Sequence, residues 1–316
     1  MSKLTFDKFI EQMQAGKVFL GNPAMGSQNL VLLEGDNIPK GTLYANLSNR
    51  EGVKRILKKH VGAGVDVLYA NTFGADKTRF GKGEFAEAYR VGLDIAKTVA
   101  PDCLVIAPLG SPDFQPLLHH LENPRYERGK LRDTISTTYP NIESEVVKGL
   151  VEGCRERMQL SIENGADAIQ LTTFTWSVGA ECIYAAYETL DRKVPLLISF
   201  QLADEYDEPR TIWGDGIDGL FDLYADSSVI GYNCFPPEKM CKAIDVSNKR
   251  GSKPLMAFPS PGRTGQTGYR INTSDFAGEI SDIIKAGARL VGACCGSTSK
   301  YTAAMRKVID NYNAQL

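Results

Sequence analysis

Short runs of apolar residues that favour β-structure recur along the whole chain, and segments with helical spacing separate most of them. The eight runs cover residues 17–22, 65–73, 103–111, 167–174, 195–201, 228–235, 254–260 and 289–295. They are continuous rather than alternating, which is typical of parallel strands buried on both faces. The pattern therefore predicts an α/β protein with a parallel sheet.

The connections between the runs follow one repeated design. Apolar residues recur at helical spacing from Ile142 to Met158, after Asn141 as a predicted N-cap. The segments "GAGVDVLYA", "ENGADAIQL" and "KAGARLVGA" each place a glycine at the end of a helix, directly before a strand. Because no linker or low-complexity stretch interrupts the series, we expect residues 1–316 to form a single (β/α)8 TIM barrel. An open, doubly wound sheet is the alternative.

Composition narrows the range of partners. The chain has 36 Lys and Arg against 38 Asp and Glu, a net charge of −2, so no basic field attracts nucleic acid or a membrane surface. No signal-peptide pattern and no apolar stretch near ~20 residues are found, so we expect a cytoplasmic protein with a small-molecule partner. Residues 111–141 are too long for an ordinary connection and predict a functional loop, in which His119 and His120 are expected to be solvated.

Cysteines offer the first candidate chemistry. Seven cysteines in a chain without a secretion signal favour buried thiols, a metal or a nucleophile over a disulfide framework. Cys234 ends the sixth run, and Cys294 and Cys295 end the eighth, so a barrel brings all three to one rim. Three thiolates suit zinc, while simple packing or a redox pair of Cys294 with Cys295 are the alternatives. The remaining cysteines are expected to pack in the core or on helices: Cys103, Cys154, Cys182 and Cys241.

Four motifs together carry a family resemblance. The segments "PAMGS", "ANTFGA", "GYNC" and "GACCGST" follow the first, second, sixth and eighth runs. As a set they resemble the zinc-dependent homocysteine S-methyltransferase family, which includes the homocysteine domain of cobalamin-dependent methionine synthase and the betaine-dependent enzymes. The similarity extends over nearly the whole chain, from about residue 18 to residue 299.

The resemblance implies a metal site and a substrate pocket. Cys234, Cys294 and Cys295 would bind one zinc per chain, and the acceptor thiol would become the fourth ligand. No catalytic residue beyond this metal site is implied. The residues expected to contact substrate are Asn22, Met25, Gly26, Ser27, Asn71, Thr172 and Asn233.

Two departures from the family pattern concern the amino-acid end of homocysteine. The family usually has Asp in the turn after the first strand and a Glu-Thr pair at the end of the fourth, whereas this chain has Asn22 and the pair Thr172-Thr173. A buried ammonium without a countercharge is costly, so the acceptor is either homocysteine or a related thiol that lacks the amine. Arg263 and Arg270, in the loop after the seventh run, are candidates to bind an acidic end of the acceptor.

The predicted function is a zinc-dependent S-methyltransferase that acts on a small thiol. Nothing in the chain resembles a corrinoid-binding domain, so the methyl donor is a small molecule or a methyl-corrinoid on a separate protein. Two alternatives remain open: demethylation of a methylated substrate toward such a corrinoid protein, and a non-catalytic zinc-binding barrel. We expect neither nucleic-acid nor membrane partners.

Overall fold

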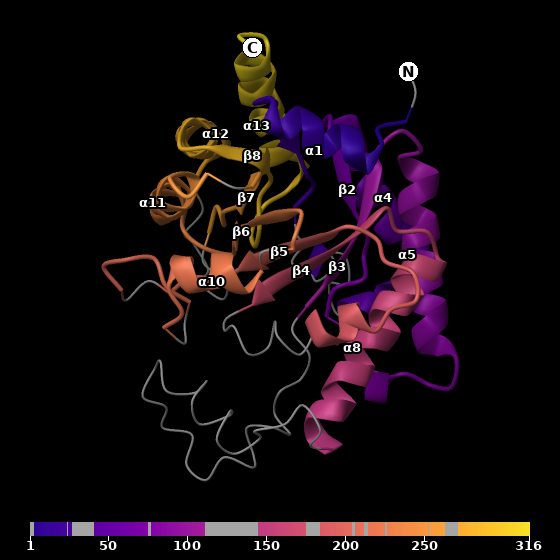
Figure 1. Cartoon of the computed structure of the whole chain (residues 1–316). Helices are drawn as coiled ribbons and strands as arrows, with labels where there is room; N and C mark the ends of the chain where they lie inside the picture. Colours follow the sequence, from indigo (N-terminus) through magenta and orange to yellow (C-terminus); the bar gives the residue numbers. More distant parts are fainter. Residues whose placement is uncertain are drawn as a thin grey trace.

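A computed structural model describes residues 3–23, 25–26, 41–74, 77–110, 145–174, 184–203, 206–211, 214–224, 226–251, 253–262 and 271–316. Eight parallel strands form one sheet in the order β1-β8-β7-β6-β5-β4-β3-β2 (Figure 1). The strands are β1 (Phe19–Leu20), β2 (Val67–Tyr69), β3 (Leu104–Leu109), β4 (Ala168–Phe174), β5 (Leu196–Phe200), β6 (Val229–Asn233), β7 (Leu255–Phe258) and β8 (Ala288–Val291). Each lies within one of the eight predicted runs, or extends it by a single residue.

The sheet closes on itself through its first strand. β1 pairs in parallel with β8, and a parallel bridge between Gly21 and Val67 connects the end of β1 to β2. The Asp66 N–H also donates to the Leu20 carbonyl at 2.8 Å. The predicted (β/α)8 barrel is confirmed, and the open-sheet alternative is excluded.

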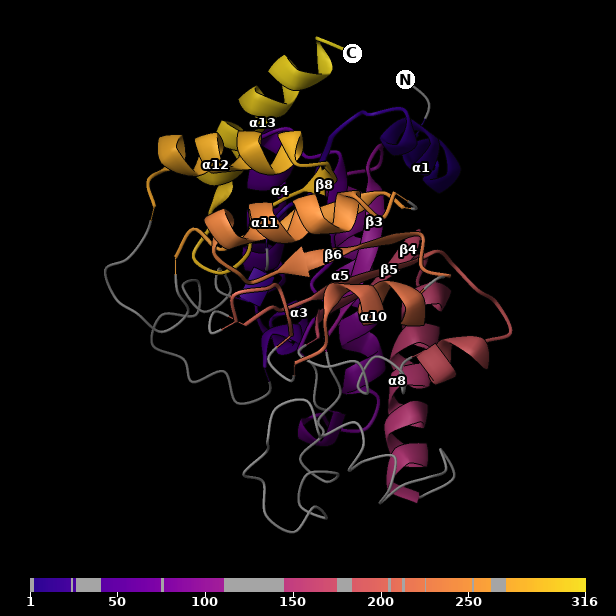
Figure 2. The same cartoon turned by 60° about the vertical axis from the view of Figure 1, so that its left-hand side comes forward.

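Helices surround the barrel and close one end of it (Figures 1 and 2). The helices are α1 (Phe6–Gln14), α3 (Ala45–Ser48), α4 (Arg50–Gly62), α5 (Glu84–Val99), α8 (Glu145–Glu163), α10 (Ile217–Leu223), α11 (Pro237–Asn248), α12 (Thr273–Lys285) and α13 (Ser299–Asn313), with 3-10 turns η1 (Thr42–Tyr44) and η2 (Lys77–Arg79). Phe9 and Met13 of α1 pack with barrel-interior residues such as Val67 and Leu104 at the start of the strands. The end of the barrel where the strands begin is filled with apolar side chains. A functional site is therefore expected at the other end, where the strands have their carboxyl ends.

The repeated entry into the strands is present as predicted. Gly64, Gly165 and Gly287 have φ of 89°, 81° and 124°, the left-handed region that glycine enters without a steric penalty. Helix α8 is described from Glu145 onward and buries Cys154 and Met158, as its pattern predicted. Its predicted cap lies outside the described residues, as does the long loop at 111–141 with its two histidines.

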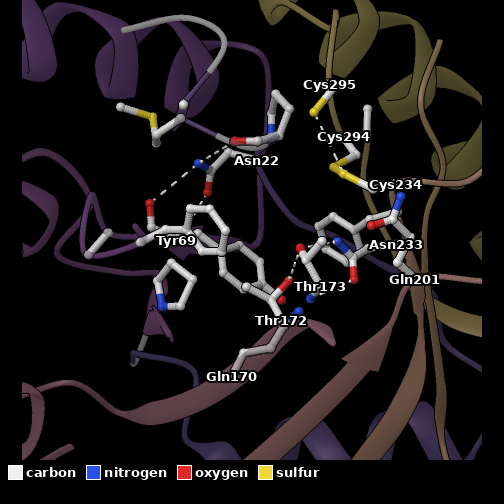
Figure 3. A pocket seen from close by; sticks show the side chains of 18 residues that line it. Asn22, Tyr69, Gln170, Thr172, Thr173, Gln201, Asn233, Cys234, Cys294 and Cys295 are labelled. Carbon is white, nitrogen blue, oxygen red and sulfur yellow. Dashed lines mark hydrogen bonds between the residues drawn. A yellow bond between two sulfur atoms is a disulfide. The ribbon is translucent and has the colours of Figure 1, made fainter. Parts of the chain in front are cut away.

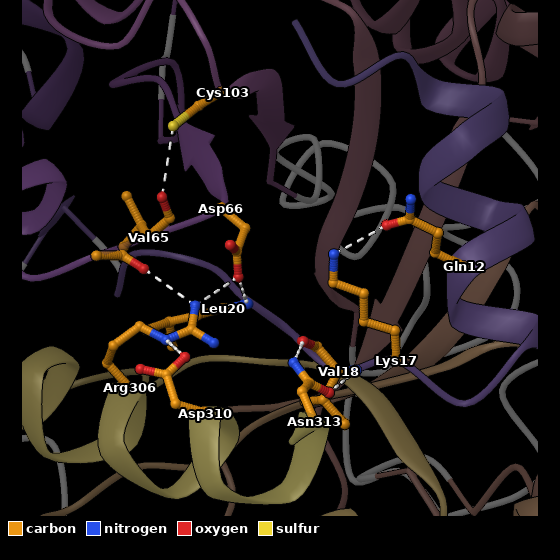
Figure 4. A network of polar contacts seen from close by, with 11 residues as sticks. Gln12, Lys17, Val18, Leu20, Val65, Asp66, Cys103, Arg306, Asp310 and Asn313 are labelled. Atoms are coloured by element: carbon orange, nitrogen blue, oxygen red, sulfur yellow. Dashed lines mark hydrogen bonds and ion pairs between the residues drawn. The ribbon is translucent and has the colours of Figure 1, made fainter. Parts of the chain in front are cut away.

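Helix α13 fastens the first strand to the rest of the barrel (Figure 4). The Asn313 side chain accepts from the Val18 N–H and donates to the Val18 carbonyl, both at 2.9 Å. The Arg306 guanidinium donates to Asp66 at 2.8 Å, and the same carboxylate accepts from the Leu20 N–H. These hydrogen bonds therefore hold β1 and the start of β2 to helix α13, at the place where the barrel closes.

The described helices were also assessed for length and apolar character. None of them is both long and apolar enough to cross a bilayer.

Candidate active site

Three cysteine sulfur atoms lie together at the carboxyl ends of β6 and β8 (Figure 3). All three Sγ atoms lie within 4.8 Å of one another. The Sγ of Cys234 is 3.6 Å from that of Cys295, and a disulfide joins Cys234 to Cys294 with Cα atoms 5.4 Å apart. The expected convergence on one rim is present, while the Cys234–Cys294 disulfide was not predicted.

The reduced form of this cluster fits a zinc ion. Tetrahedral zinc with Zn–S bonds of about 2.3 Å places neighbouring sulfur atoms about 3.8 Å apart. The 3.6 Å between Cys234 and Cys295 is close to that spacing. Thiolates are the metal-binding form of cysteine, so the disulfide must be reduced before all three residues can serve as ligands.

The backbone at Cys234 has an unusual conformation. Its φ is 55°, in the left-handed region that residues with a side chain rarely adopt. The Cys234 N–H donates to the Phe258 carbonyl at 3.1 Å, and the Ser260 N–H donates to the Phe235 carbonyl at 3.0 Å. These bonds to the end of β7 stabilise a turn that costs energy locally, a pattern common at functional sites.

A second left-handed residue lies across the pocket. Thr173, near the end of β4, has a φ of 64°, and the pairing of β4 with β5 shifts register between Leu171 and Phe174. The Thr173 N–H donates to Asn233 Oδ1 at 3.0 Å, and Asn233 Nδ2 donates to Thr173 Oγ1 at 2.7 Å. A bulge of this kind redirects side chains at a sheet edge, and Asn233 stabilises it.

A cavity of about 290 Å³ opens beside the sulfur atoms (Figure 3). It is lined by Asn22, Pro23, Met25, Gly26, Tyr69, Ala70, Phe73, Pro108, Gln170, Thr172, Thr173, Gln201, Asn233, Cys234, Phe258, Ala293, Cys294 and Cys295. Among these described residues there is no Asp, Glu, Lys, Arg or His. Apart from the cysteines, the described wall therefore offers neutral polar groups and apolar surface only.

Two aromatic rings contribute to the wall of the cavity deep in the barrel. Tyr69 and Phe258 pack edge to face with centroids 5.4 Å apart. A Cβ at Gly21 would approach both rings to 2.9 Å, so only glycine leaves them this space. The Tyr69 hydroxyl is buried without a hydrogen-bond partner, and burial raises the pKa of this phenol well above its usual value, so it remains a donor.

Most of the predicted substrate residues surround this cavity. Met25, Gly26, Thr172 and Asn233 line it. Ser27 lies outside the described residues, as do the two predicted loop arginines and the fourth packing cysteine, Cys182.

Two predicted asparagines use their side chains to connect backbone segments. Asn22 lines the cavity, but its Oδ1 accepts from the Tyr69 N–H and its Nδ2 approaches the Pro23 and Tyr69 carbonyls at 3.3 and 3.4 Å. Asn71 is buried behind the wall and donates to Asn46 Oδ1 and to the Thr42 carbonyl, both at 2.9 Å. Asn71 is thus placed beside the cavity rather than among its lining residues.

Sequence reasoning missed three polar residues of the wall, Tyr69, Gln170 and Gln201, and also Ser199, which contacts the wall residues Gln170 and Asn233. Gln170 was visible as the one long polar side chain inside the apolar segment "DAIQL". Ser199, on β5, accepts from Gln170 Nε2 at 3.0 Å and contacts Asn233 Oδ1 at 2.8 Å. A buried polar residue in a parallel strand requires hydrogen-bond partners. The glutamine within this apolar strand was therefore the available sequence signal for a polar network at this place.

The fold and the site together define a class: a (β/α)8 barrel with three clustered cysteines and a cavity whose described wall is uncharged, at the carboxyl ends of its strands. A sequence profile of the homocysteine S-methyltransferase family matches residues 24–309. The chain belongs to the homocysteine S-methyltransferase family.

Individual relatives agree with this assignment. Homocysteine S-methyltransferase 2 of Arabidopsis thaliana is 25% identical over 179 residues, which is 54% of this chain and 53% of that protein. This chain thus spans about half the length of that relative. Methionine synthase of Mycobacterium tuberculosis is 22% identical over 98% of this chain, but over only 26% of its own length.

Solved structures show the same fold. The homocysteine methyltransferase MmuM of Escherichia coli in its metallated form is 18% identical, with a TM-score of 0.68 over 97% of this chain and 99% of that one. Its oxidized form has 16% identity and a TM-score of 0.68.

Proposed function

We propose that this protein is a zinc-dependent S-methyltransferase that methylates a small thiol. The observation that supports it is the cluster of Cys234, Cys294 and Cys295, whose sulfur atoms lie within 4.8 Å of one another on the wall of a ligand-sized cavity. One zinc per chain would be bound by these three residues. The cavity beside them gives an acceptor thiol access to the remaining coordination position.

The chemistry supplied by the zinc is activation of the acceptor. A free thiol with a pKa of about 8.5 is mostly protonated at neutral pH, and coordination stabilises its thiolate, the nucleophilic form. The acceptor thiol would release its proton to solvent, and its sulfur would form a bond to the methyl carbon while the bond from the donor to that carbon breaks and the donor keeps the electron pair. No separate general base is needed, in agreement with the absence of Asp, Glu and His from the described lining residues.

The chain's own residues orient the acceptor and exclude water. Met25, Phe73 and Phe258 supply apolar surface on the wall of the cavity. Asn233 stabilises the turn at Thr173 on the opposite wall, so the polar groups there are fixed before the acceptor binds. Fixed polar groups spend no free energy on reorganisation when the substrate arrives.

The neutral wall favours an acceptor without an ammonium group. Asn22 and Thr172 stand where the family usually has acids, and no carboxylate replaces them among the described lining residues. Asn22 Oδ1 is also engaged by the Tyr69 N–H. An amine-free thiol acid is therefore the proposed acceptor, and the methyl donor is a small molecule or a methyl-corrinoid on a separate protein.

X-ray absorption at the zinc edge tests the proposal. Reduced, zinc-loaded protein is titrated with a panel of small thiols, and an acceptor is expected to add one Zn–S contact to the three from cysteine. Reduced protein that binds no zinc, or a zinc spectrum that no thiol changes, would contradict the proposed function.

A further inference from the structure

Two buried polar atoms on the cavity wall have no hydrogen-bond partner: Tyr69 Oη and Gln170 Oε1. Tyr69 ends β2 and Gln170 lies within β4, and their side chains are 6% and 3% exposed. Both residues line the cavity beside the sulfur cluster (Figure 3). Buried polar atoms are almost always paired, so two such atoms on one cavity are groups that a ligand entering it can pair.

The orientation of the Gln170 amide follows from a directed chain of hydrogen bonds. The Thr173 backbone N–H donates to Asn233 at 3.0 Å, which identifies the accepting atom as Oδ1. The Ser199 hydroxyl lies 2.8 Å from this same oxygen and 3.1 Å from Thr172 Oγ1. Asn233 Oδ1 can only accept, whereas the Thr172 hydroxyl can also donate, so the single Ser199 hydrogen is directed to Asn233 Oδ1. Ser199 Oγ then accepts from Gln170 at 3.0 Å, and the donating atom must be Nε2. The free atom of Gln170 is therefore its carbonyl oxygen, a pure acceptor.

The Tyr69 hydroxyl has the complementary character. It is a phenol with one hydrogen to donate, and its ring is fixed by Phe258 and by the space above Gly21. The described part of the cavity wall thus presents one buried donor and one buried acceptor without a partner, both uncharged. Among the described lining residues there is no carboxylate that would compensate a ligand's ammonium group.

We propose that Tyr69 and Gln170 form a recognition site for an uncharged hydroxyl group on the thiol acceptor. A hydroxyl both accepts and donates, so it can accept from Tyr69 Oη or donate to Gln170 Oε1. An ammonium cannot accept from Tyr69, and it would be buried without a countercharge. A methylene leaves both atoms unpaired. The acceptor class is a hydroxythiol acid, in which the hydroxyl takes the place of the amine of homocysteine; this inference rests on the proposed function.

The test compares three thiols with the same carbon chain: 4-sulfanylbutanoate, 2-hydroxy-4-sulfanylbutanoate and homocysteine. Each is titrated into reduced protein loaded with cobalt(II) in place of zinc, and the sulfur-to-cobalt charge-transfer band reports thiol coordination. We expect the hydroxythiol to bind about 10-fold more tightly than 4-sulfanylbutanoate, the effect of one well-formed buried hydrogen bond, and more tightly than homocysteine.

Two variants separate recognition from folding. Tyr69→Phe removes a hydroxyl that has no partner in the protein, so the denaturation midpoint should not fall, while the preference for the hydroxythiol should drop several-fold. Gln170→Leu should lose the same preference. Tyr232→Phe is the matched control, because the Tyr232 hydroxyl is bonded to Ser247 at 2.6 Å away from the cavity; it should lower stability and leave thiol preference unchanged.

The outcomes distinguish the two proposals. A charge-transfer band that no thiol alters overturns the proposed function and this inference with it. Coordination of all three thiols with equal affinity, a preference for homocysteine, or a hydroxythiol preference that survives both Tyr69→Phe and Gln170→Leu overturns the hydroxyl site alone.

Discussion

The side chain of Asn233 and the backbone of Thr173 fix each other across the barrel rim. Asn233 Oδ1 accepts from the Thr173 N–H at 3.0 Å, while its Nδ2 donates to Thr173 Oγ1 at 2.7 Å. Thr173 keeps a φ of 64° under this restraint. Because Asn233 directly precedes Cys234, one side chain connects the bulge in β4 to the turn that carries the first sulfur.

Removal of this restraint should destabilise the protein. Asn233→Ala leaves the Thr173 N–H without its acceptor and the Ser199 hydroxyl with Thr172 Oγ1 alone, and we expect a loss of about 2–4 kcal/mol in the free energy of unfolding. In a Thr173→Gly background the loss should be smaller by about 1 kcal/mol, since the Oγ1 that accepts from Asn233 Nδ2 is already absent. Urea denaturation of the four proteins measures both effects, and equal losses in the two backgrounds would show that the bond between the Asn233 and Thr173 side chains contributes nothing to stability.

The sulfur cluster predicts a specific pattern of metal loss. Reduced protein should contain about one zinc per chain, and Cys234→Ser, Cys294→Ser and Cys295→Ser should each lose it, because a three-sulfur site cannot spare a ligand. Cys103→Ser and Cys154→Ser are controls, since these residues lie outside the cluster. Zinc content by atomic emission is the measurement, and full occupancy in the three cluster variants would contradict the assignment.

The acceptor preference should respond to charge at two positions. An Asn22→Asp, Thr172→Glu double variant adds carboxylates where the family usually has them, and should shift preference toward homocysteine by one order of magnitude or more. Each charge-assisted hydrogen bond contributes about 1.5–3 kcal/mol, and 1.4 kcal/mol corresponds to a factor of ten. At position 22, aspartate still supplies an acceptor for the Tyr69 N–H, so the local fold should persist.

Competitive thiol binding at one pH gives the result for this variant. The control is Asn22→Asp alone, which changes one charge only. If the wild type already prefers homocysteine and the double variant does not increase that preference, the neutral residues do not select the acceptor.

Buried His60 predicts a loss of stability in mild acid. Burial, and to a lesser extent the neighbouring Lys59, lowers its pKa from 6.5 to about 4. As pH falls from 6.5 toward 4, the unfolded chain binds a proton that the folded chain does not, so the free energy of unfolding decreases, by about 3 kcal/mol in total. Above pH 6.5 the residue contributes no pH dependence.

The measurement compares wild type and His60→Gln by urea denaturation at pH 7 and pH 4, both reduced and free of metal. The variant retains a polar group opposite Thr302 Oγ1, which lies 2.9 Å from His60 Nδ1, but it does not titrate. Between pH 7 and pH 4, the free energy of unfolding of His60→Gln should decrease by about 3 kcal/mol less than that of the wild type. Equal losses would assign the acid sensitivity to other groups.

Local signals predicted the strands and the cysteine cluster, because apolar runs, entry glycines and strand-end cysteines are all visible along the chain. The structural role of Asn71 could not be predicted in this way. Its side chain donates to Asn46 of α3, and no spacing in the sequence indicates a contact between these two segments. Tyr69 was missed for the same reason, whereas Gln170 was visible as a polar residue in an apolar run and only its place on the cavity wall was not. A side chain on β2 and another on β4 share a cavity only after the barrel closes.

The pairing of β1 with β8 also sets a time order for the site. The second edge of β1 is covered only after β8, the last of the eight strands along the chain, has been synthesised. Asn313 and Arg306 of α13 follow β8 in the chain, so their bonds beside β1 form later still. Cys294 and Cys295 arrive on that same late segment, whereas Cys234 arrives earlier. The barrel and its three-sulfur cluster are therefore completed together once β8 and residues 294–295 have been synthesised, and neither can form before that point.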